Sequence, residues 1–161
     1  MRIVYGDLWT VPAAWRLIPT NTCVRRSGEA VMGAGVALQA ARRHPRLPAE
    51  LGAFLLKHAT DAGAPAAHFP QYRLSCLPTK TDWRRPSDLG LIERGLRQLL
   101  ADLPGLPEAA AGPIALPLLG CGLGGLPAST VRPMLERLLD NRFVLVLSPH
   151  SRHHMTRRRT R

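Results

Sequence analysis

The sequence predicts an α/β fold: a three-layer α/β/α domain around a mostly parallel, mixed central sheet. Short apolar runs typical of buried strands alternate along the chain with longer segments whose apolar residues recur every three or four positions, as in amphipathic helices. The run Ile114–Leu119 carries no charge, which is typical of a strand covered by helices on both faces. A chain of 161 residues is long enough for one well-packed domain and too short for two.

The elements follow from these patterns in chain order. The expected strands are apolar runs between turn-forming residues, at 3–5, 15–19, 68–77 (one bent strand or two short ones), 114–119 and 143–147. The expected helices have one apolar face and lie before Arg43, after Pro48, after residue 87 or 88, and near 129–140. Pro45 ends the first of them, because the residue before a proline disfavours helical geometry. Ser87 or Asp88 caps the third helix, and 102–112 is expected to be a connector.

Composition excludes several classes of protein. The chain is 45% hydrophobic and 20% charged, which is typical of a globular domain. No apolar run approaches the roughly 20 residues that span a bilayer, and an acidic residue at position 7 argues against a signal peptide. Cys23, Cys76 and Cys121 lack CxxC spacing and are expected to be reduced thiols in a cytoplasmic protein. No spacing of metal ligands is present, so neither a metal nor an organic cofactor is expected.

The charge is strongly basic. The chain has 22 Lys and Arg against 11 Asp and Glu, a net charge of +11, and five arginines of the segment 149–161 leave +6 on residues 1–148. We therefore expect a domain at 1–148 and a basic tail at 149–161, which is either a polyanion-binding arm or a solvated end. The excess of basic over acidic residues favours a nucleic-acid partner. The candidate nucleic-acid contacts lie in two loops, at Arg25, Arg26, Arg84 and Arg85.

Three loops follow expected strands and are candidates for a ligand site: 20–35, 78–86 and 120–126. Two of them are rich in glycine, which lets backbone N–H groups approach a phosphate closely. The N-terminus of the helix expected after 120–126 would complete an anion site there, because its dipole favours negative charge. Positions 120, 122 and 125 match GxGxxG, but no acidic residue follows at the distance that a dinucleotide-binding fold needs. A glycine turn without a ligand is the alternative. Lys80, one of two lysines in the chain, stands in the middle loop.

Motifs in these loops identify a family. They are Gly6-Asp7-Leu8, Thr20-Asn21-Thr22, Val31–Ala37, Leu77-Pro78-Thr79-Lys80 and Leu119–Leu126. In this order along 1–148, they resemble those of a macrodomain, the ADP-ribose-binding α/β/α module. The branch that they resemble includes the terminal ADP-ribose glycohydrolases and the DarG-type antitoxin macrodomains.

The resemblance implies roles for individual residues. Asp7 would contact the adenine amino group, Asn21 would lie by the distal ribose, and Lys80 would be the catalytic lysine, with Asn21 as its catalytic companion. An amine can attack a ribose aldehyde as a Schiff-base nucleophile, whereas an arginine cannot. Beside the diphosphate, Lys80 could instead act as an electrostatic clamp. From the residues alone, Asn21 is about as well explained as a side chain that closes a turn. The expected ADP-ribose contacts are Asp7, Leu8, Thr20, Asn21, Met32, Gly33, Gly35, Val36, Thr79, Gly120, Cys121, Gly122, Leu123, Gly124 and Gly125.

One departure from the family pattern concerns the substrate. Relatives that remove ADP-ribose from acidic protein side chains carry an Asp directly after Gly-Cys-Gly-Leu, where this chain has Gly124. The antitoxin-like relatives, which act on ADP-ribosylated thymidine in DNA, have glycine there. With the basic composition, this favours a nucleic-acid substrate.

The sequence therefore predicts an ADP-ribosyl hydrolase that releases ADP-ribose from modified nucleic acid, most simply thymidine-linked ADP-ribose in DNA. A cognate ADP-ribosyltransferase toxin and a monomeric state are further expectations, and no membrane partner is expected. Three alternatives stay open: a phosphatase of ADP-ribose 1″-phosphate, a module that binds ADP-ribose without chemistry, and a general nucleic-acid-binding protein whose pocket is unused.

Overall fold

The computed structural model describes residues 1–149. Their centre is a six-stranded sheet with the order β1-β6-β5-β2-β4-β3. All neighbouring strands run parallel except β3, which pairs antiparallel with β4 at one edge. The predicted mixed and mostly parallel sheet is therefore confirmed. The expected basic tail lies outside the described residues, apart from Pro149.

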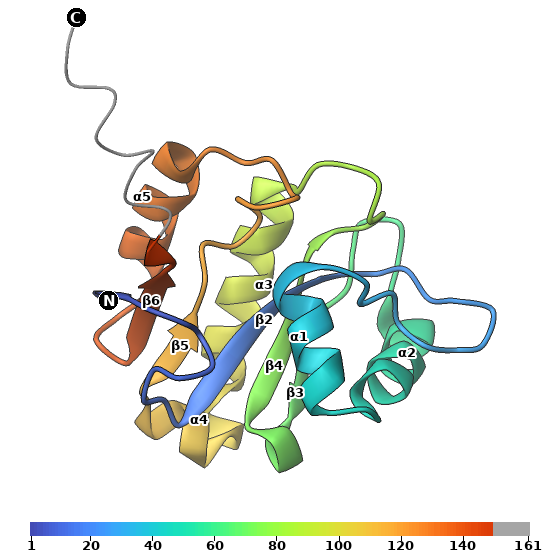
Figure 1. Ribbon diagram of the computed structural model, residues 1–161, viewed down its shortest axis with the longest axis horizontal. Coiled ribbons are helices and arrows are strands. Elements are labelled where there is room, and N and C mark those ends of the chain that lie inside the picture. Colours follow the sequence, from blue (N-terminus) through green and yellow to red (C-terminus); the bar gives the residue numbers. More distant parts are fainter. Residues whose placement is uncertain (150–161) are drawn as a thin grey trace, which may run out of the picture.

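The elements follow one another as in a wound α/β domain (Figure 1). The strands are β1 (Arg2–Tyr5), β2 (Trp15–Asn21), β3 (Ala67–Phe69), β4 (Leu74–Lys80), β5 (Ile114–Leu116) and β6 (Phe143–Leu147). The helices are α1 (Gly35–Arg43), α2 (Leu47–His58), α3 (Leu89–Asp102), α4 (Pro107–Ala111) and α5 (Ala128–Leu138), with 3-10 turns at Pro70–Tyr72 and Leu103–Gly105.

Helices cover both faces of the sheet. The apolar residues of α1 and α2 pack on one face in a core that includes Ile18. Those of α3, α4 and α5 pack on the other face, in a second core that includes Leu17. Leu17 and Ile18 are adjacent and fully buried because successive strand residues point to opposite faces. This confirms the three-layer α/β/α architecture.

The structure resolves two local alternatives and adds an element. Residues 68–77 form two strands, since the 3-10 turn at Pro70–Tyr72 separates β3 from β4. Asp88 caps α3 by accepting a hydrogen bond from the backbone N–H of Leu91 at 2.9 Å. The expected connector at 102–112 contains α4, whose five residues are too few to show a helical period. No helix within residues 1–149 is long and apolar enough to cross a membrane.

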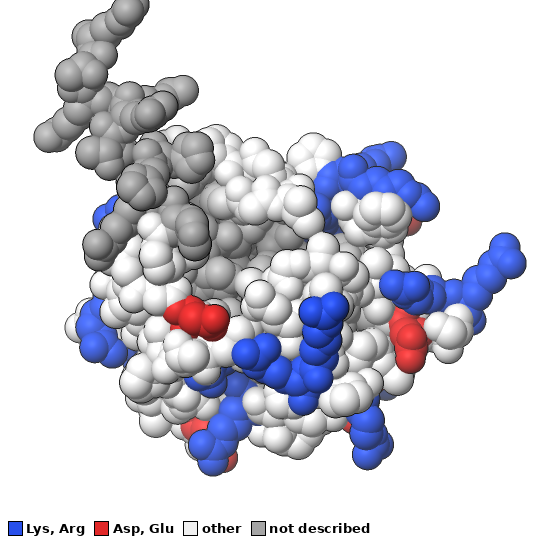
Figure 2. All heavy atoms as spheres, viewed as in Figure 1, with Lys and Arg blue, Asp and Glu red and all other residues white. Residues whose placement is uncertain are grey.

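The surface charge of the described residues is unevenly distributed. Figure 2 shows Lys and Arg side chains gathered over the loop that follows β2, the loop between β4 and α3, and the region of α1. The first two of these loops carry the four arginines that were predicted to contact nucleic acid, and all four are exposed. Part of the basic character predicted from composition therefore lies near the ends of β2 and β4.

A buried polar network joins the sheet to the helices behind it. The Ser75 hydroxyl, which is fully buried, accepts a hydrogen bond from Trp15 Nε1 at 2.9 Å and lies 2.8 Å from His68 Nδ1. His68 Nε2 lies 3.0 Å from Asp102 Oδ2, which also accepts a hydrogen bond from Gln98 Nε2. Because Ser75 is closed to solvent, this serine, histidine and aspartate arrangement stabilises the edge of the sheet and does not act as a nucleophile.

Removing the Ser75 hydroxyl is expected to destabilise the domain. Ser75→Ala leaves the buried Trp15 N–H without its acceptor, which lowers the free energy of unfolding by about 1–3 kcal/mol. Urea denaturation measures this difference. Ser129→Ala, at an exposed position of α5, is the matched control and should change stability by less than about 0.5 kcal/mol. Equal stability of the two variants would show that the network contributes nothing.

Candidate functional site

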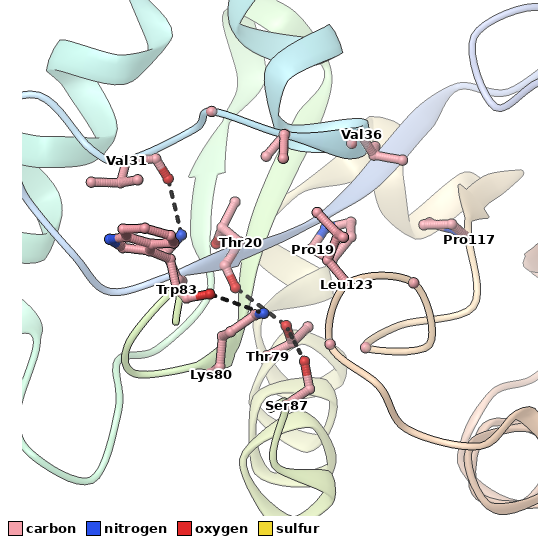
Figure 3. Close-up of a pocket in the computed structure, with 18 of the residues that line it drawn as sticks. Pro19, Thr20, Val31, Val36, Thr79, Lys80, Trp83, Ser87, Pro117 and Leu123 are labelled. Atoms are coloured by element: carbon pink, nitrogen blue, oxygen red, sulfur yellow. Dashed lines mark hydrogen bonds between the residues drawn. The ribbon is translucent and has the colours of Figure 1, made fainter. Parts of the chain in front are cut away.

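A cavity of about 590 Å³ opens where β2, β4 and β5 end (Figure 3). The carboxyl ends of parallel strands meet at one edge of a sheet, which is where α/β folds bind ligands. The three loops predicted from the sequence come together here. Its lining includes Thr20, Asn21, Arg25, Gly33–Ala37, Thr79, Lys80, Trp83, Ser87, Gly120 and Gly122–Gly124.

The pairing of β2 with β4 places Asn21 beside Lys80. An irregularity in the ladder between Thr20 and Asn21 brings Asn21 opposite Lys80. Asn21 Oδ1 accepts a hydrogen bond from the Cys23 N–H at 2.8 Å, and Asn21 Nδ2 donates to the Val31 carbonyl at 3.0 Å. Asn21 thus closes a turn and also anchors the far end of its loop. An amide NH₂ group has two donors, so one N–H of Asn21 remains for a ligand.

Lys80 enters the cavity from the end of β4. Its Nζ donates a long hydrogen bond of 3.5 Å to the Trp83 carbonyl (Figure 3). Within residues 1–149, no carboxylate lies within 4.0 Å of Nζ. A half-buried cation without a carboxylate partner is available to an anion or to an electrophilic carbon in the cavity.

The N-terminus of α1 forms the wall that suits an anion. Residues 33–37 line the cavity, and the helix begins within them at Gly35. The first N–H groups of a helix have no acceptor inside it, and the helix dipole favours negative charge at this end. No acidic side chain stands in the first turn of α1 to satisfy them. The wall is therefore suited to a phosphate.

The glycine loop 120–126 forms the opposite wall and is held by Ser87. The Ser87 N–H donates to the Gly124 carbonyl at 2.8 Å, and its hydroxyl donates to Thr79 Oγ1 at 3.1 Å. A Cβ built on Gly124 would overlap Ser87 Oγ and the Gly120 carbonyl. Position 124 therefore excludes any side chain unless the loop moves. The predicted anion site included the helix after this loop, but α5 begins at Ala128, which lines neither cavity described here.

Thr20 contributes a hydroxyl without a partner. Thr20 is 5% exposed, and its Oγ1 is buried and has no hydrogen-bond partner among residues 1–149. Leaving a buried hydroxyl unsatisfied costs free energy, which a polar ligand would recover. Because Thr20 lines the cavity, this orphaned atom supports a ligand with hydroxyl or phosphate oxygens.

A second cavity of about 520 Å³ adjoins the first. Val36, Pro117, Leu118 and Gly122 line both, so the two form one cleft across the ends of the sheet. Asp7 and Leu8 line the second cavity. Asp7 Oδ1 accepts the Trp9 N–H at 2.7 Å, which fixes the carboxylate in place.

Arg16 holds the loop that presents Asp7. From the start of β2, its guanidinium donates to the carbonyls of Leu8 at 2.9 Å, Trp9 at 3.3 Å and Val11 at 3.0 Å. Burial lowers the pKa of Arg16, and the nearby Arg43 lowers it further. An arginine keeps its charge in spite of such shifts. A charged residue within an otherwise apolar strand is a signal for such a role, but the sequence prediction did not name Arg16.

The predicted site residues fall into two groups. The structure brings most of them to the cleft, including Cys121, whose pKa is raised to about 11 by burial, so that it is a thiol at neutral pH. It does not bring Met32 or Gly125 to either cavity, and Met32 is buried in the core under α1. Of the four predicted nucleic-acid contacts, Arg25 lines the cleft, whereas Arg26, Arg84 and Arg85 do not.

Trp83 and Ser87 are among the lining residues that the sequence prediction missed as ligand contacts. Trp83 follows Lys80 in a polar loop. A large apolar side chain among charged neighbours is the sequence feature that could have identified it as a contact. Ser87 was considered only as a helix cap. Its bond to Gly124 joins segments far apart in the chain, and no local pattern reveals it.

Comparison with known proteins identifies the family. No family model matches the chain. A solved structure, the macrodomain of Thermus aquaticus DarG, superposes with a TM-score of 0.71 at 32% identity and covers 92% of this chain and 97% of that one. The chain belongs to the macrodomain family.

Two curated macrodomain relatives carry names that describe an activity. A Thermus aquaticus protein named DNA ADP-ribosyl glycohydrolase is 33% identical over 151 residues, which are 87% of this chain and 38% of that protein. A Thermosipho africanus protein named DNA ADP-ribosyl transferase-DNA ADP-ribosyl glycohydrolase fusion protein is 40% identical over 63 residues, 39% of this chain and 16% of that protein. The chain thus spans well under half the length of the curated relatives that it matches.

Filling the space at Gly124 is expected to disturb the loop. Gly124→Ala places a methyl group against Ser87 Oγ and the Gly120 carbonyl, and such overpacking lowers the free energy of unfolding by about 1–3 kcal/mol. Gly122→Ala is the matched control in the same loop, since a Cβ there meets no atom within 4 Å. Chemical denaturation of both variants measures the difference. A Gly124→Ala variant as stable as the control would contradict the packing described here.

Proposed function

We propose that this macrodomain releases ADP-ribose from ADP-ribosylated DNA. The observation that carries the proposal is Lys80, an amine without a carboxylate partner that projects into the cleft beside Asn21. The name of the Thermus aquaticus relative, DNA ADP-ribosyl glycohydrolase, supports the same reaction. A lysine rather than an arginine at this position supports nucleophilic chemistry, because an amine can form a covalent bond to carbon.

The two cavities suit the two ends of ADP-ribose. Asp7 would accept a hydrogen bond from the adenine amino group in the second cavity. The N-terminus of α1 and the glycine loop 120–126 would hold the diphosphate between the cavities. The distal ribose would then lie in the first cavity, where Thr20 Oγ1 and the remaining N–H of Asn21 offer partners for its hydroxyl groups.

Lys80 would act at C1″ of the distal ribose. Its amine donates an electron pair to C1″, and the bond between C1″ and the acceptor breaks with its electron pair going to the acceptor. The acceptor takes the proton that Nζ gives up. The sugar on Nζ opens to an imine, and water then hydrolyses the imine to free ADP-ribose and the lysine amine.

Two features support DNA as the acceptor. The exposed arginines Arg25, Arg26, Arg84 and Arg85 lie in the loops beside the cavity mouth and would attract the phosphates of a strand. Gly124 has no carboxylate, and the space beside it is taken by Ser87, so the Asp found in hydrolases of protein-linked ADP-ribose has no room there. The DNA strand would therefore pass over the two basic loops.

The partners follow from the same reaction. An ADP-ribosyltransferase must produce the substrate, and the name of the Thermosipho africanus relative joins a transferase and a glycohydrolase in one fusion protein. We expect a cognate toxin of this kind, a monomeric macrodomain and a cytoplasmic location. The free cysteines Cys23, Cys76 and Cys121 are consistent with a reducing compartment.

Release of ADP-ribose from two substrates tests the proposal. One substrate is a single-stranded oligonucleotide ADP-ribosylated on thymidine, and the other is a protein ADP-ribosylated on glutamate. Wild type is expected to act on the oligonucleotide, and both Lys80→Ala and Lys80→Arg are expected to lose at least about 100-fold in rate. The readout is free ADP-ribose. Lys57→Arg, at an exposed position of α2, is the matched lysine control and should retain full activity.

Other outcomes would identify the alternatives. Tight binding of ADP-ribose without release from either substrate would leave a binding module. Turnover of ADP-ribose 1″-phosphate alone, insensitive to salt, would identify a phosphatase, because a small free substrate needs no basic surface. Binding of oligonucleotides with no affinity for ADP-ribose would leave a nucleic-acid-binding protein with an unused pocket. Activity that survives Lys80→Arg would show that Lys80 contributes its positive charge and is not a nucleophile.

A further inference from the structure

We propose that Trp83, with Leu123 across the mouth of the cavity, forms the binding surface for the nucleobase that carries ADP-ribose. The inference rests on the proposed function and specifies how the acceptor is recognised. It assigns to this chain a stacking site outside the residues that hold ADP-ribose itself. Stacking on the aromatic side chain, and not hydrogen bonds to the edge of the base, would then favour a nucleobase over an aliphatic acceptor.

Trp83 is exposed although it is large and apolar. Its side chain is 51% exposed, and it lines the first cavity beside Lys80. The Trp83 backbone carbonyl accepts the hydrogen bond from Lys80 Nζ at 3.5 Å, so the reacting amine lies against the loop that carries the indole (Figure 3). An acceptor that leaves from C1″ at Lys80 would therefore leave at the cavity wall that Trp83 helps to form.

The loop that carries Trp83 is held in place before any ligand binds. The backbone N–H of Arg84 donates to Asp82 Oδ1 at 2.9 Å, and that of Arg85 donates to the Asp82 carbonyl at 3.0 Å. Thr22 Oγ1, in the loop after β2, donates a hydrogen bond to the carbonyl of Thr81 at 2.9 Å and so joins the two loops. The Arg84 guanidinium lies 4.9 Å from the centre of the Trp83 ring and pairs with Asp82. A stacking surface that is already ordered loses less entropy when it binds.

Leu123 presents a second apolar surface from the glycine loop. It is 81% exposed and lines the same cavity. In the view of Figure 3, Trp83 and Leu123 lie on either side of Lys80. Two exposed apolar side chains on separate loops at one cavity mouth form a surface that suits a flat, apolar face. The faces of an unpaired nucleobase have this chemistry, and the basic loops around the mouth suit the phosphates that such a base carries with it.

The magnitude of stacking sets the expected effect. Stacking of a base on an aromatic side chain changes affinity by roughly 10-fold to 100-fold when the side chain is truncated to alanine. Because the ring would contact the base and not ADP-ribose, truncation of Trp83 would lower affinity only for substrates with a nucleobase acceptor. A phenylalanine keeps a stacking face, so Trp83→Phe would recover most of the loss.

The experiment compares Trp83→Ala, Trp83→Phe and Leu123→Ala with wild type. Equilibrium binding is measured for free ADP-ribose and for an ADP-ribosylated single-stranded oligonucleotide, in a Lys80→Ala background that holds the substrate intact. The readout is the affinity for the ADP-ribosylated oligonucleotide divided by the affinity for free ADP-ribose. Trp83→Ala is expected to lower this ratio by at least about 10-fold, with a smaller decrease for Leu123→Ala and near-complete recovery for Trp83→Phe. Leu56→Ala is the matched control, because Leu56 is 70% exposed on α2 and lines neither cavity.

The outcomes separate this inference from the proposed function. A ratio unchanged in Trp83→Ala, or an equal loss of affinity for both ligands, would overturn the stacking site while leaving the hydrolase reaction intact. Failure of the wild-type chain to release ADP-ribose from the oligonucleotide would overturn the proposed function. The affinity ratio would still decide whether Trp83 binds the base, since it does not depend on turnover.

Discussion

The parallel pairing of β2 with β4 places Asn21 opposite Lys80, and the rest of the site is built around that pair. A shift of one residue in either strand would turn one of these side chains to the other face of the sheet. The Asn21 side chain then fixes the loop after β2 through Cys23 and Val31, and this loop leads into the start of α1. Register in the sheet therefore determines where the lysine, the amide and the helix N-terminus meet.

The cleft combines fixed walls with polar groups whose hydrogen-bonding capacity residues 1–149 leave wholly or partly unused. Ser87 holds the glycine loop against the end of β4, and Arg16 holds the loop that carries Asp7. Against these walls lie the first N–H groups of α1, the Thr20 hydroxyl and the Lys80 amine, which a ligand can satisfy. These groups give an elongated anionic ligand hydrogen-bond donors that the fold has already placed along one cleft.

Much of the fold and of the site was predictable because both depend on local patterns. Alternating apolar strands and amphipathic helices reveal the layers, and glycine and lysine after strands reveal the loops that line the cleft. The rest depends on contacts between distant segments. Gly124 excludes a side chain because the distant Ser87, as well as the Gly120 carbonyl, lies where a Cβ would be, and Met32 packs in the core with residues of α1 and α2. Trp83 stands in a loop without periodicity, and α4 is shorter than the two turns that a helical pattern needs.

A covalent bond between the substrate and Lys80 is the central claim, and reductive trapping tests it most directly. The chain would be incubated with the ADP-ribosylated oligonucleotide and sodium cyanoborohydride, and its peptides analysed by mass spectrometry. The account predicts a reduced ADP-ribosyl adduct on Lys80 and none on Lys57, the other lysine of the chain. Release of ADP-ribose at the normal rate with no adduct on Lys80 would contradict it and leave the lysine as an electrostatic partner of the diphosphate.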